Sequence, residues 1–382
     1  MEAVIVAYGR SAVGRANKGF FSNVHPIDYA GQVLQGVLEK LPQLNHNDID
    51  DVIYGCSFPV HMQTYDIAKM VALRAGLPAE IPGITVSRFC SSGLDAISLA
   101  AARIMAGQAE VVVAGGVESM SLTPKREKET ENKWLIDNVK DAYLHVGFAG
   151  ENTAFMYNTT KEEMAEAAAE SHQRAAAAQN AGKFDDEIIP VSITDDNGET
   201  ITITKDEGIR GDSTAEKIGQ LKPAFGENGL LTAGTASQRS DGTGCVVLMS
   251  KEKADELGIK PIAKFIAASP SSGSPSVLTP GLINAVKKVC KRTGLSTDDM
   301  DVIELNEAFA SVLVSATREL NLDPKKVNPN GGAMALGHPL GATGAILTCK
   351  ALSELQRING KYAMVTMCVA AGQGCAGIFE RI

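Results

Sequence analysis

The chain carries the same order of elements twice, and this repetition constrains its fold more than any other feature. In the first third, an acidic turn leads into a short strand that begins at Val52, and Cys90 follows 38 positions later. In the last third, an acidic turn and a strand recur, and His338 follows 36 positions after Val302. A helix rich in small residues comes directly after each. We therefore predict a duplicated α/β unit whose halves each present one reactive residue at the start of a helix.

Apolar runs and helical spacing predict the remaining elements of the two halves. A glycine at position 107 is placed to end the first small-residue helix. Because 382 residues usually make two domains or halves, we expect one half over 1–258 and the other over 259–382. The expected strands cover 4–7, 52–54, 84–89, 110–116, 301–305 and 362–369, and the expected helices cover 28–40, 94–106 and 341–355.

The stretch from about 119 to 232 has a different composition and predicts a loop domain inserted in the N-terminal half. Residues 125–133 form a charge run, which is typical of a solvated surface. A helix is expected over 161–181, with Thr160 and Glu163 spaced for a capping box. Residues 191–204 place Asp-Asn-Gly between Thr-rich strands, which indicates a hairpin.

Charge and cysteine usage exclude several classes of protein. The net charge of −9 gives no general basic surface for nucleic acid, although a local basic pocket stays possible. Seven irregularly spaced cysteines with no CxxC pair argue against a disulfide framework and a zinc ribbon, so we expect a cytoplasmic protein without a metal site. The N-terminus predicts a strand, not a signal peptide, and no run approaches the about 20 apolar residues of a membrane span.

His338 lies among five glycines in the stretch from 330 to 344. Gly337 and Gly341 flank the His338-Pro339 pair, so the imidazole is expected on a stiff turn that a substrate can approach closely. Histidine gives and takes protons near neutral pH. The alternative is a glycine-rich turn with a structural histidine.

Cys90 follows the expected strand at 84–89 and precedes the expected helix at 94–106. A helix N-terminus favours the thiolate, which can carry an acyl group as a thioester. The small residues Ser91, Ser92 and Gly93 leave the sulfur approachable. The alternative is a buried cysteine that acts as a small hydrophobic residue.

Two further polar residues follow buried strands. Cys368 ends the last strand, and Asn306 comes directly after the strand at 301–305. Strand ends are where ligands bind in α/β sheets, and an amide there can hold a water or an oxygen. A core thiol and a helix N-cap are the competing interpretations.

Eight motifs along the whole chain resemble those of the thiolase family, the coenzyme A-dependent acyltransferases that make or cleave β-ketoacyl-CoA. The resemblance implies two topologically similar αβαβαββ halves in a layered αβαβα core, a loop domain, and assembly as dimers or tetramers. The motifs are VSRFCSSGLDA around Cys90, AGGVESMS at 114–121, HVGFAGEN at 145–152, LKPAF at 221–225, LTAGTAS at 231–237, NEAFA at 306–310, NGGAMALGHPLGATG at 330–344 and CVAAGQG at 368–374.

The same resemblance implies a role for each matching residue. Cys90 matches the acyl-accepting nucleophile, and His338 matches the histidine that activates it and donates to an oxyanion hole. Asn306 matches the asparagine that holds a water as second donor of that hole. Cys368 matches the acid/base that removes the α-proton of acetyl-CoA. The backbone N–H groups of Cys90 and Ala370 match a second oxyanion hole.

The substrates implied are coenzyme A and its thioesters, with no metal or prosthetic group. Two thiols and one imidazole suffice for the two activations that a Claisen condensation needs. Arg210 and Ser237 fall where the family contacts coenzyme A, and the resemblance places His145, Phe309 and Leu278 beside the substrate too.

The chain departs from the family pattern on the side of the site that would meet the acyl group. Ser87 stands where asparagine is usual, three residues before Cys90, and Ala370-Ala371 replace glycines in the last loop. Val146 stands where methionine is common, and LTPGL at 278–282 differs from the biosynthetic enzymes. We expect the reaction class to hold while the preferred acyl chain stays open.

The leading hypothesis is therefore an acetyl-CoA acyltransferase acting on acetoacetyl-CoA or a short β-ketoacyl-CoA. A thiolase of broader chain length, as in fatty-acid β-oxidation, is the main alternative. A β-ketoacyl synthase shares the fold, but it uses cysteine with two histidines, or with histidine and asparagine, and gives Cys368 no role. A non-catalytic acyl-CoA binding protein is a further alternative, but it is expected to lose catalytic residues that this chain keeps.

Overall fold

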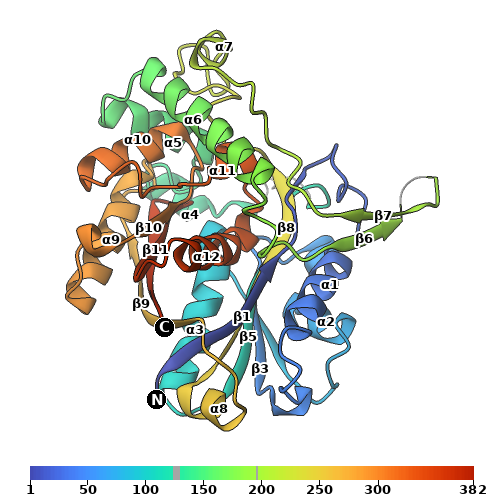
Figure 1. Ribbon diagram of the computed structural model, residues 1–382. Helices are drawn as coiled ribbons and strands as arrows, with labels where there is room; N and C mark the ends of the chain where they lie inside the picture. The colour runs from blue at the N-terminus through green and yellow to red at the C-terminus, as the bar shows by residue number, and fades with distance from the viewer. Residues whose placement is uncertain (124–129, 195–196) are drawn as a thin grey trace.

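The computed structural model describes residues 1–123, 130–194 and 197–382 (Figure 1). Ten strands form one large sheet, in the order β10-β11-β12-β9-β1-β8-β5-β3-β4 with β2 paired to β8, and β6 and β7 form a separate hairpin. The strands are β1 (Ala3–Arg10), β2 (Gly14–Arg15), β3 (Asp51–Gly55), β4 (Gly83–Val86), β5 (Val111–Ser119), β6 (Val191–Thr194), β7 (Thr200–Ile203), β8 (Ser240–Ser250), β9 (Ala263–Ser272), β10 (Val302–Leu305), β11 (Tyr362–Val369) and β12 (Gln373–Arg381).

The sheet consists of two halves with the same pairing pattern, which confirms the duplication. In the N-terminal half β3 pairs in parallel with β5, and β5, β8 and β1 then follow in antiparallel pairs. In the C-terminal half β10 pairs in parallel with β11, and β11, β12 and β9 follow in antiparallel pairs. The halves meet where Val4 and Ile5 of β1 pair with β9.

Three hydrophobic clusters divide the helices into layers, which gives the expected αβαβα order. α1 and α2 cover one face of the N-terminal half, and α9 and α10 cover one face of the C-terminal half. α3 and α12 lie between the halves, because their apolar residues share one cluster with residues from both. The helices of these layers are α1 (Pro26–Leu38), α2 (Ile67–Arg74), α3 (Ser92–Met105), α9 (Thr279–Thr293), α10 (Ala310–Glu319) and α12 (Leu340–Arg357), with the short helices α8 (Lys251–Glu256) and α11 (Ala333–Leu336) beside them.

The predicted elements are present with end shifts of a few residues. One of these shifts concerns the site, since the strand expected over 84–89 ends at Val86 as β4 and a 3₁₀ turn at Phe89–Ser91 precedes α3. Gly107 adopts a left-handed φ of 70° after α3, as its predicted capping role requires.

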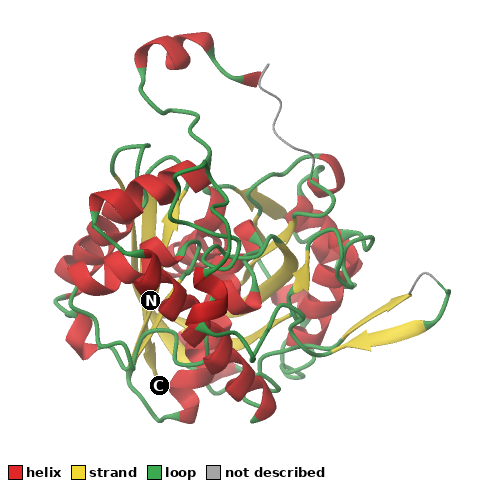
Figure 2. Ribbon diagram, turned by 90° about the horizontal axis from the view of Figure 1, so that it is seen from above, coloured by secondary structure: helices red, strands yellow, loops and turns green. Residues whose placement is uncertain are grey.

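The segment between β5 and β8 carries α4 (Lys133–Asn138), α5 (Val146–Met156), α6 (Lys161–Asn180), the β6–β7 hairpin and α7 (Ala215–Gly219). The capping box of Thr160 and Glu163 is present at the start of α6. The hairpin is also confirmed, and α4 and the hairpin stand away from the body of the molecule (Figure 2). The charge run predicted at 125–133 falls mostly outside the described residues.

α3 and α12 approach each other at backbone distance near their N-termini. A Cβ added to Gly93 would lie 2.8 Å from the backbone nitrogen of Ala345, and one added to Gly344 would lie 2.3 Å from that of Leu94. Glycine is therefore required at both places, because any side chain would push the helices apart. This crossing brings the starts of the two small-residue helices together.

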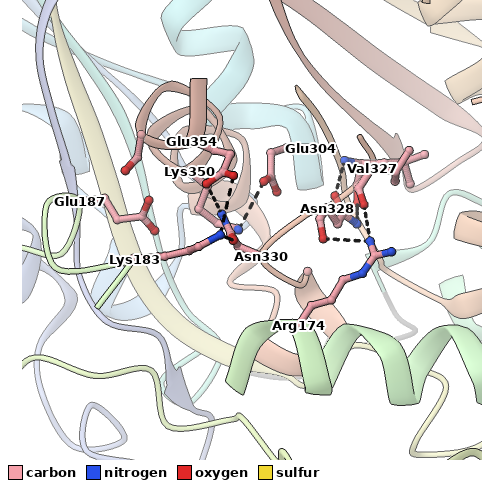
Figure 3. A network of polar contacts seen from close by, with 12 residues as sticks. Arg174, Lys183, Glu187, Glu304, Val327, Asn328, Asn330, Lys350 and Glu354 are labelled. Atoms are coloured by element: carbon pink, nitrogen blue, oxygen red, sulfur yellow. Dashed lines mark hydrogen bonds and ion pairs between the residues drawn. The ribbon is translucent and has the colours of Figure 1, made fainter. Parts of the chain in front are cut away.

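The two edges of the large sheet differ. β4 is the last strand at one edge and pairs only with β3. At the other edge, Val327 forms a single parallel bridge with Ile303 of β10. The Arg174 guanidinium of α6 donates to the carbonyl of Val327 at 2.7 Å and so ties α6 to the segment that lies along this edge (Figure 3). No helix of the described residues is long and apolar enough to cross a membrane.

Candidate active site

Cys90 lies in the 3₁₀ turn between β4 and α3, and its side chain is buried with 6% exposed. Phe89 enters this turn with a left-handed φ of 45°, which is strained for an aromatic residue. This conformation changes the direction of the backbone immediately before Cys90. Strained backbone of this kind is frequent at functional sites.

Burial raises the pKa of the Cys90 thiol to about 12. Hydrogen bonds from the backbone N–H groups of Ala370 and Cys90 lower it, and the nearby Glu118 carboxylate raises it. The N–H donors thus favour the thiolate, as expected of a helix start, but desolvation outweighs them and the pKa is raised overall. A base must therefore take the proton when the sulfur reacts. The same two N–H groups are the predicted second oxyanion hole.

His338 follows Gly337, whose φ of 114° only glycine adopts readily, and it lies at the start of α12. Its Nδ1 is 2.6 Å from the Thr343 hydroxyl, and its Nε2 is 3.3 Å from the Asn306 amide nitrogen. Since Nε2 faces a donor, this arrangement places the ring hydrogen on Nδ1 and leaves a lone pair on Nε2. Burial lowers the pKa of His338 to about 4, so the ring is a neutral base at neutral pH.

Asn306 follows β10 directly and is fully buried. Its backbone N–H donates to the carbonyl of Thr366 on β11 at 2.9 Å. Its side-chain oxygen has no hydrogen-bond partner among the described residues. A buried acceptor without a partner calls for an explanation, and a bound water or substrate group supplies one. It is not the helix N-cap, because Phe309 holds that position for α10.

Cys368 lies near the end of β11 with 1% of its surface exposed. Burial raises its pKa, and the proximity of Cys90 raises it further. The two sulfurs therefore interact, and neither ionises easily while the other is charged. Beyond Cys368, Ala371 adopts a left-handed φ of 61°, a conformation in which the glycine usual in the family would be unstrained.

Ser237 belongs to a segment that joins the Asn306 and His338 loops. The N–H of Ser237 donates to the carbonyl of Ala308 at 3.0 Å. On its other side, the N–H of His338 donates to the carbonyl of Gln238 at 3.0 Å. Ser237 is half-buried between these contacts, which places it in the wall beside the imidazole.

His145 and Phe309 are linked by a third aromatic residue. The His145 and Phe225 rings lie 5.9 Å apart, and Phe225 meets Phe309 edge-on at 5.7 Å. Gly147 permits this contact, because a Cβ there would lie 2.3 Å from the Phe225 ring. His145 is exposed and Phe309 buried, so the row leads from the surface toward Asn306.

Two predicted substrate residues lie outside this grouping. Leu278 is completely buried in the hydrophobic cluster that also contains Cys368 and Phe309, so it contributes to the core around the sulfur. Arg210 is exposed and contacts His172 of α6, with Arg210 Nη2 3.2 Å from His172 Nε2. The structure does not place Arg210 against Cys90, His338, Asn306 or Cys368.

Sequence reasoning missed Thr343, Phe225 and Glu118. All three lie inside motifs that resemble those of the family, but no chemistry was expected of them; Thr343 follows His338 by five positions in the motif at 330–344. Within 1–123, 130–194 and 197–382, there is no cluster of three or more His, Cys, Asp or Glu residues that could hold a metal ion.

Comparisons with known proteins agree over the whole chain. The family model described as "Thiolase, N-terminal domain" matches residues 3–252, and "Thiolase, C-terminal domain" matches 259–381. The chain is 42% identical to a 3-ketoacyl-CoA thiolase of Bacillus subtilis, covering 99% of both chains. It is 39% identical to a beta-ketothiolase of Cupriavidus necator, covering 100% of this chain and 99% of that one. The crystal structure of the Bacillus anthracis acetyl-CoA acetyltransferase matches with a TM-score of 0.92 and 37% identity, over 100% of this chain and 99% of that one.

Proposed function

The chain belongs to the thiolase family and is an acyltransferase, and from this premise we propose that Cys90 carries the acyl group while His338 and Cys368 move the protons. The observation that supports this assignment is the grouping of these side chains. The Cys90 sulfur interacts with Cys368 and with the N–H of Ala370, and the imidazole meets the Asn306 amide. All of them are buried at the ends of strands and the starts of helices from both halves.

The first half-reaction transfers the acyl group to Cys90. His338 Nε2 takes the proton of the Cys90 thiol, and the sulfur attacks the thioester carbonyl. The N–H groups of Cys90 and Ala370 stabilise the charge that develops on the oxygen. The bond to the coenzyme A sulfur then breaks, and that sulfur leaves as a thiol with the proton of Cys368. The product is acyl-Cys90, an imidazolium and a Cys368 thiolate.

The second half-reaction forms the carbon–carbon bond. The Cys368 thiolate takes the α-proton of the second acetyl-CoA, and a hydrogen bond from His338 and a water on Asn306 stabilise the enolate oxygen. The enolate carbon attacks the acyl-Cys90 carbonyl, and the bond to the Cys90 sulfur breaks. Cys90 recovers its proton from the imidazolium. The net change converts two acetyl-CoA to acetoacetyl-CoA and coenzyme A, and the reverse is thiolysis.

A label transfer tests the assignment of Cys90. After incubation with radiolabelled acetyl-CoA and proteolysis, we expect the label on the peptide that contains Cys90. A label on another peptide, or no label, would contradict it.

Proton exchange tests the assignment of Cys368 separately. A Cys368→Ala enzyme should still become acetylated but should lose exchange of the acetyl-CoA α-protons with solvent. Exchange at the wild-type rate would remove Cys368 from the mechanism.

We propose acetoacetyl-CoA or a short β-ketoacyl-CoA as the preferred substrate, with a longer chain as the alternative. The names of the similar proteins include both a 3-ketoacyl-CoA thiolase and an acetyl-CoA acetyltransferase. Ala370 and Ala371 stand where the family usually has glycine, and their added methyl groups support the shorter chain. Thiolysis rates with C4 to C16 β-ketoacyl-CoAs decide between them. A kcat/KM that rises with chain length would contradict our choice.

We further propose that Arg210 and Ser237 contact coenzyme A and that His145 and Phe309 lie beside the substrate, with Leu278 supporting the site from the core. The proposal also includes the halves 1–258 and 259–382 and the loop domain at about 119–232. A cytoplasmic homodimer or homotetramer completes the proposal. The free state of all seven cysteines fits a reducing compartment. The unpaired edge at β4, where Ile84 is 39% exposed, supports assembly. Sedimentation equilibrium of the full chain tests it, and a monomer at micromolar concentration would contradict it.

A further inference from the structure

Glu118 is a fully buried carboxylate at the end of β5 that none of the proposed proton transfers uses. Its Oε2 accepts the backbone N–H groups of Ser57 and Gly341, each at 2.8 Å. Its Oε1 accepts the side-chain N–H of Gln63 at 2.8 Å and the N–H of Phe58 at 3.4 Å. Its acceptor positions are thus directed at donors from three separate segments.

The donors come from the surroundings of both reactive groups. Ser57 is tied to the Cys90 side, because the Ser87 hydroxyl donates to its carbonyl at 3.1 Å. Gly341 lies three residues after His338, in the first turn of α12. One carboxylate oxygen therefore joins the two halves between the nucleophile and the base. The contact is close, since a Cβ on Gly341 would lie 2.5 Å from the nitrogen of Ser57 and 2.8 Å from Glu118 Oε2.

We propose that Glu118 is a positioning residue that holds the Cys90 turn and the His338 loop in one fixed arrangement across the interface between the halves. The inference rests on the proposed function, because it concerns the separation of the groups that exchange a proton there. The carboxylate also stabilises the N-terminus of α12, because the first turn of a helix has free N–H groups and attracts negative charge. An apolar side chain could fill the space but could not bind either segment.

The charge of Glu118 has a second effect that a purely structural residue would lack. Burial is the main cause of the raised pKa of the Cys90 thiol, and the charge of Glu118, which the Ser57 and Gly341 N–H groups hold at the end of β5, raises that pKa further. The other titratable groups that face Glu118 are Cys56 on the β3 side, whose sulfur lies 3.8 Å from Oε1, and Tyr29 of α1. Neither group is a cation, so neither supplies a positive charge to the carboxylate. Removing the negative charge of Glu118 should make Cys90 easier to ionise.

Two substitutions separate the charge from the reach of the side chain. Glu118→Gln keeps the shape and loses the charge, and its amide N–H₂ would face one pair of donors. Glu118→Asp keeps the charge but is one methylene too short to reach both Ser57 and Gly341. We expect kcat to fall in both variants, on the order of 100-fold. Alkylation of Cys90 by iodoacetamide should become faster only in Glu118→Gln. That variant should therefore combine a more reactive Cys90 with a lower kcat.

The control is Asp51→Asn. Asp51 is a buried carboxylate at the start of β3, at the opposite end of that strand from Ser57, and it pairs with Arg103. The substitution should change neither kcat nor the alkylation rate of Cys90. The buried Cys245 should stay unmodified in every variant, which shows that the fold is closed. Unchanged kcat in both Glu118 variants would overturn the positioning role. Acetylation of a residue other than Cys90 in the wild type would instead overturn the proposed function.

A measurement on the wild-type protein covers the case in which both variants fail to fold. Hydrogen exchange followed by mass spectrometry should show slow exchange for the amides of Ser57, Phe58 and Gly341, although the first two lie in a loop. Exchange as fast as in an unstructured peptide would mean that the carboxylate does not hold these segments.

Discussion

At the residue scale, the tautomer and the orientation of the His338 ring depend on the hydrogen bond that its Nδ1 makes. Thr343 lies in the first turn of α12, and its hydroxyl accepts the Nδ1 hydrogen. The Nε2 lone pair then faces the Asn306 amide in the resting site and is the one that takes the Cys90 proton. The contact with Thr343 fixes both the tautomer and the orientation of the ring. An imidazole without it can rotate or carry its hydrogen on the wrong nitrogen, which costs catalysis although the ring is present.

We therefore predict that Thr343→Val lowers the rate of Cys90 acetylation by at least about tenfold, in line with the loss of a base-orienting group. Thr343→Ser, which keeps the hydroxyl, should restore most of the rate. Rapid-quench acetylation assays measure both. If valine and serine act alike, the methyl group and not the hydroxyl is what matters at this position.

The sequence predicts the identity of the main site residues but not their protonation states. Cys90, His338, Asn306 and Cys368 could be named in advance, because each stands in a motif of distinctive chemistry. The protonation state of Cys90 could not, since it depends on how completely the turn is buried. Thr343 could not be predicted for a similar reason. Nothing distinguishes this threonine from the other small residues of its helix until the structure places its hydroxyl beside the imidazole.

At the element scale, the crossing of α3 and α12 sets the site. Alanine normally stabilises a helix by about 1 kcal/mol relative to glycine. At Gly344 the added methyl group would meet the backbone nitrogen of Leu94 at 2.3 Å, and backbone cannot give way as a side chain can. The cost of overpacking therefore exceeds the gain in helix propensity.

Gly344→Ala should accordingly lower the free energy of unfolding by about 1–3 kcal/mol. Gly219→Ala in α7 is the matched control, because a Cβ there has nothing within 4 Å. Urea denaturation followed by circular dichroism gives both values. A stabilised Gly344→Ala protein would show that the two helices can separate without loss.

Most elements could be predicted from periodicity, because apolar residues form continuous runs in buried strands and recur on one face of amphipathic helices. The duplication could be predicted for the same reason. The 3₁₀ turn before α3 could not, because the apolar Phe89 continues the strand pattern while its backbone adopts a left-handed φ. The layering of α3 and α12 between the halves also needed the structure, since it depends on contacts between distant glycines.

At the scale of the whole molecule, a buried polar network connects the inserted segment with the C-terminal half (Figure 3). At its centre, Lys350 of α12 lies 3.4 Å from Glu304 of β10, and both side chains are inaccessible. Burial raises the pKa of Glu304 to about 7, although Lys350 lowers it, and Glu187 and Glu307 face it as further carboxylates. The folded protein thus binds this proton more tightly than the unfolded chain.

A raised pKa makes stability fall as pH rises. The contribution of Glu304 should be complete below its unfolded value of 4.5 and lost as pH passes about 7. The free energy of unfolding of the wild type relative to Glu304→Gln should therefore decrease between pH 5 and pH 8, on the order of 3 kcal/mol. Chemical denaturation across this range measures it, with exposed Glu80→Gln as the control. A difference that grows with pH would show that Lys350 dominates instead.

The unequal edges of the sheet decide how copies of this chain can meet. A sheet with two open edges can add a neighbour on each side, and such addition continues into a filament. Here the backbone at 326–328 lies along the outer side of β10, since the N–H of Ile303 donates to the carbonyl of Lys326 and the N–H of Asn328 donates to that of Ile303. Among the described residues, no strand covers the outer side of β4. Pairing through that single edge uses it up in both partners. If copies of this chain paired at β4, strand addition would therefore stop at two, because the segment at 326–328 already covers the opposite edge.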